Sequence, residues 1–135
     1  MRSLLAVALG YVVMLVAFIG GEMAFTALAP GLMPEPGEPP DAVYFAFKLG
    51  TGFFFMMIGG YVTALLAGRA ELKHALGLSA VSIVMSILEA TLFEGEQPLW
   101  YSIALMFFSI PSALAGGYFR ARQVEDEKES ATLAD

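Results

Sequence analysis

Residues 49–74 read LGTGFFFMMIGGYVTALLAGRAELKH, and this stretch decides the fold. It begins with an uncharged, mostly apolar run over residues 49–68, and Arg69, Glu71, Lys73 and His74 follow directly. A helix needs ~17–25 such residues to cross the hydrocarbon core of a bilayer, so the run is long enough to span a membrane. Because Lys and Arg collect at the cytoplasmic ends of membrane spans, the basic cluster predicts that this run ends in the cytoplasm.

The same alternation of apolar runs and charged connections occurs along the whole chain. Further uncharged runs cover residues 3–21, 75–88 and 97–119. Six of the seven Lys and Arg residues flank these runs on one side of the pattern: Arg2, Arg69, Lys73, Arg120, Arg122 and Lys128. The two remaining connections, Pro30–Asp41 and Glu94–Gln97, carry only acidic charge. This bias predicts that both termini are cytoplasmic and that the acidic connections lie outside, most simply in a bacterial cytoplasmic membrane.

The composition agrees with a membrane protein. Hydrophobic residues make up 58% of the 135 residues and charged residues 15%, whereas soluble domains average ~45–50% and ~25%. We therefore expect an all-α integral membrane protein with four transmembrane helices in an antiparallel bundle, over about residues 3–28, 41–68, 73–93 and 98–119. The first run is longer than the ~7–15 apolar residues of a signal peptide, so we expect it to stay uncleaved despite Ala27-Leu28-Ala29.

The domain organisation follows from the charge distribution. Residues 1–122 form one predicted four-span membrane domain. Residues 123–135 are charged, lack aromatic side chains and have no apolar face, so they predict a solvated, frayed or disordered cytoplasmic tail. The proline-rich connection Pro30–Asp41 predicts a stiff external segment, which is either a rigid spacer or a docking surface for another subunit.

Small residues recur on the predicted helices and favour close approach of helix backbones. They are Ala6, Gly10, Ala17, Gly21 and Ala24 in the first span, and glycines 50, 52, 59, 60 and 68 with Ala64 in the second. The bulky run Phe53–Met57 is expected to face lipid or a partner. In addition, Gly59-Gly60-Tyr61 recurs as Gly116-Gly117-Tyr118, and Tyr44 matches Tyr101 at the same offset, which is typical of two helical hairpins in tandem.

Three ionisable side chains lie inside predicted spans: Glu22, Lys48 and Glu89. At a rise of 1.5 Å per residue, each lies roughly 6–12 Å below the outer end of its helix. A charge within the bilayer is costly unless an opposite charge lies at the same depth. We therefore predict that Lys48 lies within salt-bridge or one-water reach of Glu22 or Glu89. This cluster is either an ion or proton site or an internal tie that fixes helix register.

A polar stripe accompanies the charges. Ser79, Ser82, Ser86 and Glu89 are spaced by three, four and three residues, which places them on one helix face, and Thr51 lies one turn below Lys48. The fourth span carries Ser102, Ser109 and Ser112 around Pro111, which should kink the helix. Trp100, Tyr101 and Tyr44 are expected at the outer membrane interface.

Several kinds of chemistry have no support in the sequence. The chain has no cysteine and one histidine, so thiolate metal sites and a bis-histidine haem are excluded. His74 is expected to be an exposed interfacial residue rather than a haem or chlorin ligand. Nothing resembles a nucleic-acid footprint or a catalytic motif. We expect no enzyme activity, no metal and no cofactor.

Two functions remain open. The first is a non-catalytic accessory or structural subunit of a larger respiratory, photosynthetic or transport complex in the lipid bilayer. Its contacts to other membrane subunits would use the small-residue helix faces and the Pro30–Asp41 loop. The second is a small ion- or proton-coupled transporter or channel that works as a homo-oligomer around Glu22, Lys48 and Glu89.

Overall fold

The computed structural model describes residues 2–34, 38–92 and 97–134, and these residues are helical throughout except at the connections. The α-helices are α1 (Arg2–Leu28), α2 (Ala42–Ala67), α3 (Glu71–Leu92) and α4 (Leu99–Ala134), and a short 3₁₀ helix, η1 (Pro30–Leu32), follows α1. Each α-helix is long and apolar enough to cross a membrane. The prediction of four apolar helices is therefore confirmed. The expected turn at Glu94 and Glu96 and the centre of the proline-rich connection lie outside the described residues.

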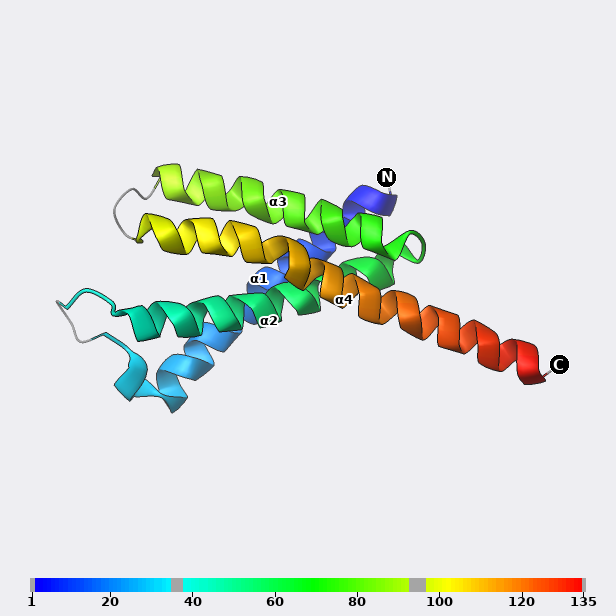
Figure 1. Cartoon of the computed structure of the whole chain (residues 1–135), viewed down its shortest axis with the longest axis horizontal. Coiled ribbons are helices and arrows are strands. Elements are labelled where there is room, and N and C mark those ends of the chain that lie inside the picture. The colour runs from blue at the N-terminus through cyan, green and yellow to red at the C-terminus, as the bar shows by residue number, and fades with distance from the viewer. Residues whose placement is uncertain (1, 35–37, 93–96, 135) are drawn as a thin grey trace.

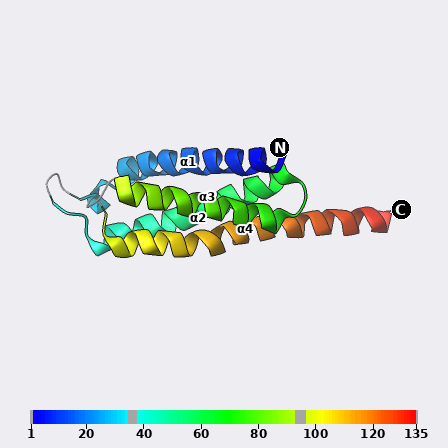
Figure 2. The same cartoon turned by 90° about the horizontal axis from the view of Figure 1, so that it is seen from above.

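The four helices form a bundle in which each helix packs against its neighbours to a different extent. The most extensive contact is between α2 and α4, while α1 packs mainly on α2 and α3 mainly on α4. Figure 2 shows α1 and α4 on opposite sides of the bundle with α2 and α3 between them. The buried core lies where these helices meet, around Met56, Leu78 and Ala113.

Glycines allow the backbones of α2 and α4 to touch. A Cβ atom placed on Gly60 would lie 2.8 Å from Cα of Ala113, and one on Gly116 would lie 2.6 Å from the backbone nitrogen of Tyr61. Neither position has room for a side chain while the helices stay where they are. The predicted close-packing role of Gly60 is thus confirmed, and the two Gly-Gly-Tyr segments lie against each other in this interface. Gly50 was expected on the same face, but apart from its own helix backbone no atom of the described residues lies within 4 Å of its Cβ position.

The ends of α2 are set by local chemistry. Asp41 precedes the helix in an extended conformation, and its side chain accepts a hydrogen bond of 2.8 Å from the backbone N–H of Tyr44. Such an N-cap satisfies a backbone donor that has no partner within the helix. Gly68 ends the helix at φ +64°, in the left-handed region that favours glycine. Gly68 was predicted to extend the packing face, but it is a helix cap with open space around it.

The C-terminal segment is helical, which corrects the prediction of a frayed or disordered tail. Helix α4 continues without interruption to Ala134 and projects away from the bundle (Figure 1). The hydroxyl of Tyr61 donates a 2.8 Å hydrogen bond to Gln123, and Arg120 forms an ion pair of 3.5 Å with Glu127. The polar composition of this segment shows that it buries no apolar face. It does not prevent helix formation, because Ala, Glu, Gln, Lys and Arg are all good helix formers.

Pro111 lies inside α4, and α4 bends in this region (Figure 1). Proline has no N–H, so the carbonyl group of Phe107, four residues earlier, loses its helical donor. The adjacent hydroxyls bond the carbonyls on either side of it: Ser109 Oγ donates to Met106, and Ser112 Oγ donates to Phe108. The two serines thus bond the carbonyl groups that flank the one freed by the proline.

Candidate functional site: a cavity lined by a carboxylate

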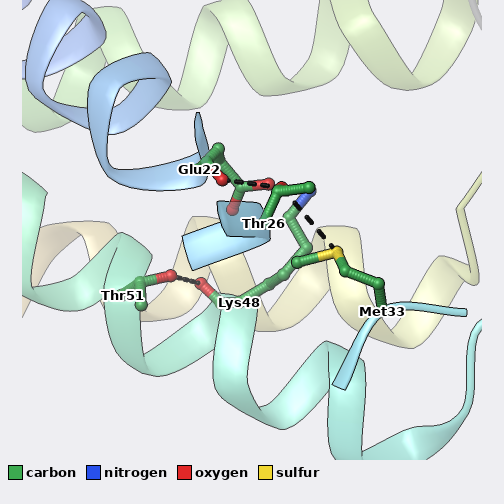
Figure 3. Close-up of polar contacts among 5 residues, drawn as sticks. All are labelled: Glu22, Thr26, Met33, Lys48 and Thr51. Carbon is green, nitrogen blue, oxygen red and sulfur yellow. Dashed lines mark hydrogen bonds and ion pairs between the residues drawn. The ribbon is translucent and has the colours of Figure 1, made fainter. Parts of the chain in front are cut away.

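Lys48 and Glu22 form an ion pair between α2 and α1. The Nζ atom of Lys48 lies 3.4 Å from Oε2 of Glu22, and the side chains are 19% and 26% exposed, respectively. Figure 3 shows Lys48 reaching from α2 toward Glu22. The same ammonium group lies 5.5 Å from the ring centroid of Tyr44 and 5.8 Å from that of Phe18, within cation–π range. The predicted contact between Lys48 and Glu22 is confirmed.

Neighbouring contacts hold this pair in place. The hydroxyl of Thr26 donates to the backbone oxygen of Glu22 at 2.8 Å, and the rings of Phe25 and Phe47 stack with centroids 3.8 Å apart. Thr51 was expected beside the charges, but its hydroxyl donates to the backbone oxygen of Lys48 at 3.0 Å and satisfies its own helix. The Glu22–Lys48 pair is therefore part of a packed tie between α1 and α2.

Glu89 differs from Glu22 because it has no ion-pair partner within 4 Å among residues 2–34, 38–92 and 97–134. It lines an open-sided cavity of about 220 Å³ to which all four α-helices contribute, and the residue is itself exposed. The three predicted charges thus divide into a neutral pair and a carboxylate on a cavity wall.

The second half of the chain lacks the matching cation. The offset that places Gly59-Gly60-Tyr61 on Gly116-Gly117-Tyr118 also places Lys48 on Leu105. Leu105 lines the same cavity as Glu89. Position 105 is therefore apolar, whereas position 48 carries the cation that pairs with Glu22.

The predicted serine stripe on α3 divides in the same way. Ser82, Ser86 and Glu89 line the cavity, so this face is directed into the bundle as expected. Ser79 instead is buried and donates to the backbone oxygens of Ala75 at 3.3 Å and Ser109 at 3.2 Å, which ties α3 to α4. The hydroxyl of Ser82 donates a hydrogen bond of 3.6 Å to the sulfur of Met56. Ser82 and Ser86 therefore provide polar groups on the cavity wall next to the carboxylate.

The rest of the cavity wall is largely aromatic and sulfur-containing. Its rings are those of Tyr11, Phe18, Phe53, Phe55, Tyr101 and Phe108. Its thioethers are those of Met14, Met56 and Met85. A single carboxylate and a few hydroxyls in a wall of this kind form an amphipathic site, which is the usual make-up of a small-molecule pocket.

The prediction for the Phe53–Met57 run is wrong in part. The run was expected to face lipid or a partner, and Phe53 and Phe54 are 37% and 52% exposed, but Phe53, Phe55 and Met56 also line the cavity. Tyr101, which was expected at the membrane interface, is 2% exposed and packs against Phe45. Hydrophobicity alone does not separate lipid-facing from cavity-facing rings. The helical spacing of Phe53 and Met56 relative to Gly60 was the available signal.

The remaining candidates do not form a site. The Nδ1 atom of His74 lies 3.0 Å from the backbone oxygen of Ala70 within its own turn. No group of three or more His, Cys, Asp or Glu side chains able to hold a metal ion occurs among the residues that the structure describes. Comparisons with family models, curated proteins and solved structures give no match, so the functional argument rests on this geometry.

Proposed function

We propose that this protein is a small cation-coupled transporter or channel, working as a homo-oligomer, in which Glu89 carries the transported or coupling cation. In this proposal the four helices form an antiparallel bundle in a bacterial cytoplasmic membrane, with both termini in the cytoplasm. The Glu22–Lys48 pair then holds α1 against α2. The observation that carries the proposal is the position of Glu89 on the cavity wall without an ion-pair partner in the described part of the chain.

The charge balance supports a cation. Glu22 and Lys48 neutralise each other, so the remaining ionisable side chain, Glu89, gives the interior of the spans a net formal charge of −1. An ionised side chain at the centre of a transmembrane helix costs ~2.5–3.5 kcal/mol on insertion scales, and less toward the interface. A purely structural position would be served by a neutral side chain. A carboxylate that takes up a proton or another cation, by contrast, gives a reason for this cost.

The test is flux through the purified protein in liposomes. We expect wild-type protein to carry protons or monovalent cations down an imposed gradient, and Glu89→Gln to abolish this flux while the protein stays folded. Glu71→Gln is the matched control, because Glu71 begins α3 far along the helix from Glu89. Absence of wild-type flux for protons, Na⁺ and K⁺, or full flux in Glu89→Gln, would reject the proposal.

A non-catalytic accessory subunit is the second candidate, and α1 favours it. Large exposed hydrophobic side chains follow one face of α1 at alternating intervals of four and three residues: Leu5, Leu9, Val12, Val16, Ile19 and Met23. This spacing fits a second helix packed along α1. Small residues first considered for docking, such as Gly10 and Gly60, already pack against neighbouring helices inside this bundle. Co-migration with other polypeptides on native gels after mild extraction would support the subunit, and a lone homo-oligomer the transporter.

A further inference from the structure

We infer that the cavity takes a small organic cation with an apolar body, whose ammonium group lies against Glu89 and whose body lies among the aromatic and methionine side chains. This inference rests on the proposed function and names the class of ligand. It also accounts for two features that a proton site leaves unexplained, namely the volume of the cavity and the character of its wall.

The wall does not suit a bare metal ion. Hard cations such as Ca²⁺ need six to eight oxygen ligands, and Mg²⁺ needs six. Besides the Glu89 carboxylate, the side chains of the wall offer only neutral hydroxyls as oxygen ligands. The hydroxyl of Ser82 bonds the sulfur of Met56, and those of Ser109 and Ser112 are engaged with their own helix. An organic ammonium spreads its charge over methyl or methylene groups and needs fewer oxygen ligands. A single carboxylate together with ring faces satisfies it, as in aromatic cages for quaternary ammonium groups.

The wall suits an apolar body with a cationic end. Phe18, Tyr101 and Phe108 contribute rings to a space that Glu89 also lines. Ring faces attract cations and also contact apolar groups, and methionine side chains adapt to the shape of a ligand. A cation–π contact of this kind already occurs beside the cavity, where the ammonium of Lys48 lies 5.5–5.8 Å from the ring centroids of Tyr44 and Phe18.

The volume sets the size of the ligand. An apolar cavity of ~150 Å³ holds a benzene molecule. At about 220 Å³, this open-sided cavity has room for one ring and a compact ammonium head. Benzyltrimethylammonium has this size and charge. Benzylsulfonate matches its ring and overall shape but is anionic, and tetramethylammonium keeps the head without the ring.

The experiment measures binding of these three probes to the full chain in phosphatidylglycerol nanodiscs. Titration calorimetry gives the affinity, and the fluorescence of Trp100, the single tryptophan, reports on Tyr101, whose ring centroid is 6.0 Å away. We expect benzyltrimethylammonium to bind at least about tenfold more tightly than tetramethylammonium and benzylsulfonate not to bind, since tenfold corresponds to about 1.4 kcal/mol. Equal binding of the cationic and anionic benzyl probes would overturn the inference.

Two matched pairs of variants locate the site. Glu89→Gln should weaken benzyltrimethylammonium binding at least about tenfold, whereas Glu71→Gln should leave it unchanged. Phe108→Leu should weaken it about two- to fivefold through loss of a ring face, whereas Phe119→Leu, at an exposed ring outside the cavity, should not. Unchanged binding in folded Glu89→Gln would overturn the inference. If that variant does not fold, the comparison of probes on wild-type protein decides.

Two further outcomes separate this inference from its premises. Proton flux that depends on Glu89, without binding of benzyltrimethylammonium, would reject the ligand class and leave the transport proposal standing. Binding that depends on Glu89, without any flux, would reject transport and leave the site standing.

The trimethylammonium group of a phosphatidylcholine headgroup has the same chemistry as the head of benzyltrimethylammonium. A lower apparent affinity in phosphatidylcholine nanodiscs would therefore support the site with lipid as the source, and an unchanged affinity would support it with a free cation.

Discussion

Replacing Gly60 with alanine should force α2 and α4 apart. The new Cβ would lie 2.8 Å from Cα of Ala113 and 2.9 Å from its carbonyl carbon. Carbon atoms in contact prefer ~3.5–4.0 Å, so the two backbones must separate by roughly 0.7–1.2 Å at this point. A gap of ~0.5–1 Å removes a quarter to a half of each dispersion contact. Since overpacking typically costs ~1–3 kcal/mol, we expect Gly60→Ala to lower the free energy of unfolding by that amount.

The matched control is Gly50→Ala on the same helix, because no atom from another part of the described chain lies within 4 Å of that Cβ position. Alanine is the better helix former by ~0.5–1 kcal/mol, so Gly50→Ala should be neutral or stabilising. Unfolding of both variants by SDS in mixed micelles, followed by circular dichroism, measures the difference. Equal stability of the two variants would refute the argument that backbone contact at Gly60 holds the bundle together.

Three further predictions use the same unfolding assay. Lys48→Met should lower the free energy of unfolding by ~1–3 kcal/mol because it leaves Glu22 unpaired. Adding Glu22→Gln to this variant should recover part of the lost stability, whereas adding Glu89→Gln should recover less. Equal recovery in the two double variants would contradict the pairing of Lys48 with Glu22. Gly68→Ala should cost ~1–2 kcal/mol because the helix cap adopts φ +64°, and a neutral effect would show that the cap relaxes. Thr63→Val should leave the stability nearly unchanged because the buried hydroxyl has no hydrogen-bond partner among the described residues. Ser79→Ala should cost ~1 kcal/mol because it removes the hydrogen bond to the backbone oxygen of Ser109 in α4. A larger loss in Thr63→Val than in Ser79→Ala would contradict these hydrogen-bond assignments.

The helices were predictable because their signals are local. Apolar runs of sufficient length, Asp41 before α2 and Gly68 after it each act within a few residues of the helix that they define. The Glu22–Lys48 contact was also predictable, because a charge within a membrane span restricts its partner to the same depth. In these cases one physical constraint was strong enough to leave few alternatives.

The cavity was not predictable, because it depends on how the helices are rotated about their axes. In an apolar sequence, Phe55 on the cavity wall and Phe54 on the outside have the same hydrophobicity. For the same reason depth alone did not decide which glutamate pairs with Lys48. The helical tail was missed because polarity indicates exposure and says little about backbone conformation.

Cysteine labelling in intact cells tests the central claim, a four-span membrane bundle with both termini in the cytoplasm, most directly. The chain has no cysteine, so each introduced thiol is unique, and Glu38, Lys73 and Ser130 are all exposed. With a membrane-impermeant maleimide, we predict that Glu38→Cys reacts in intact cells, whereas Lys73→Cys and Ser130→Cys react only after permeabilisation. Reaction of Lys73→Cys in intact cells, or protection of Glu38→Cys, would contradict the predicted topology and with it the placement of Glu89 in the outer half of the membrane.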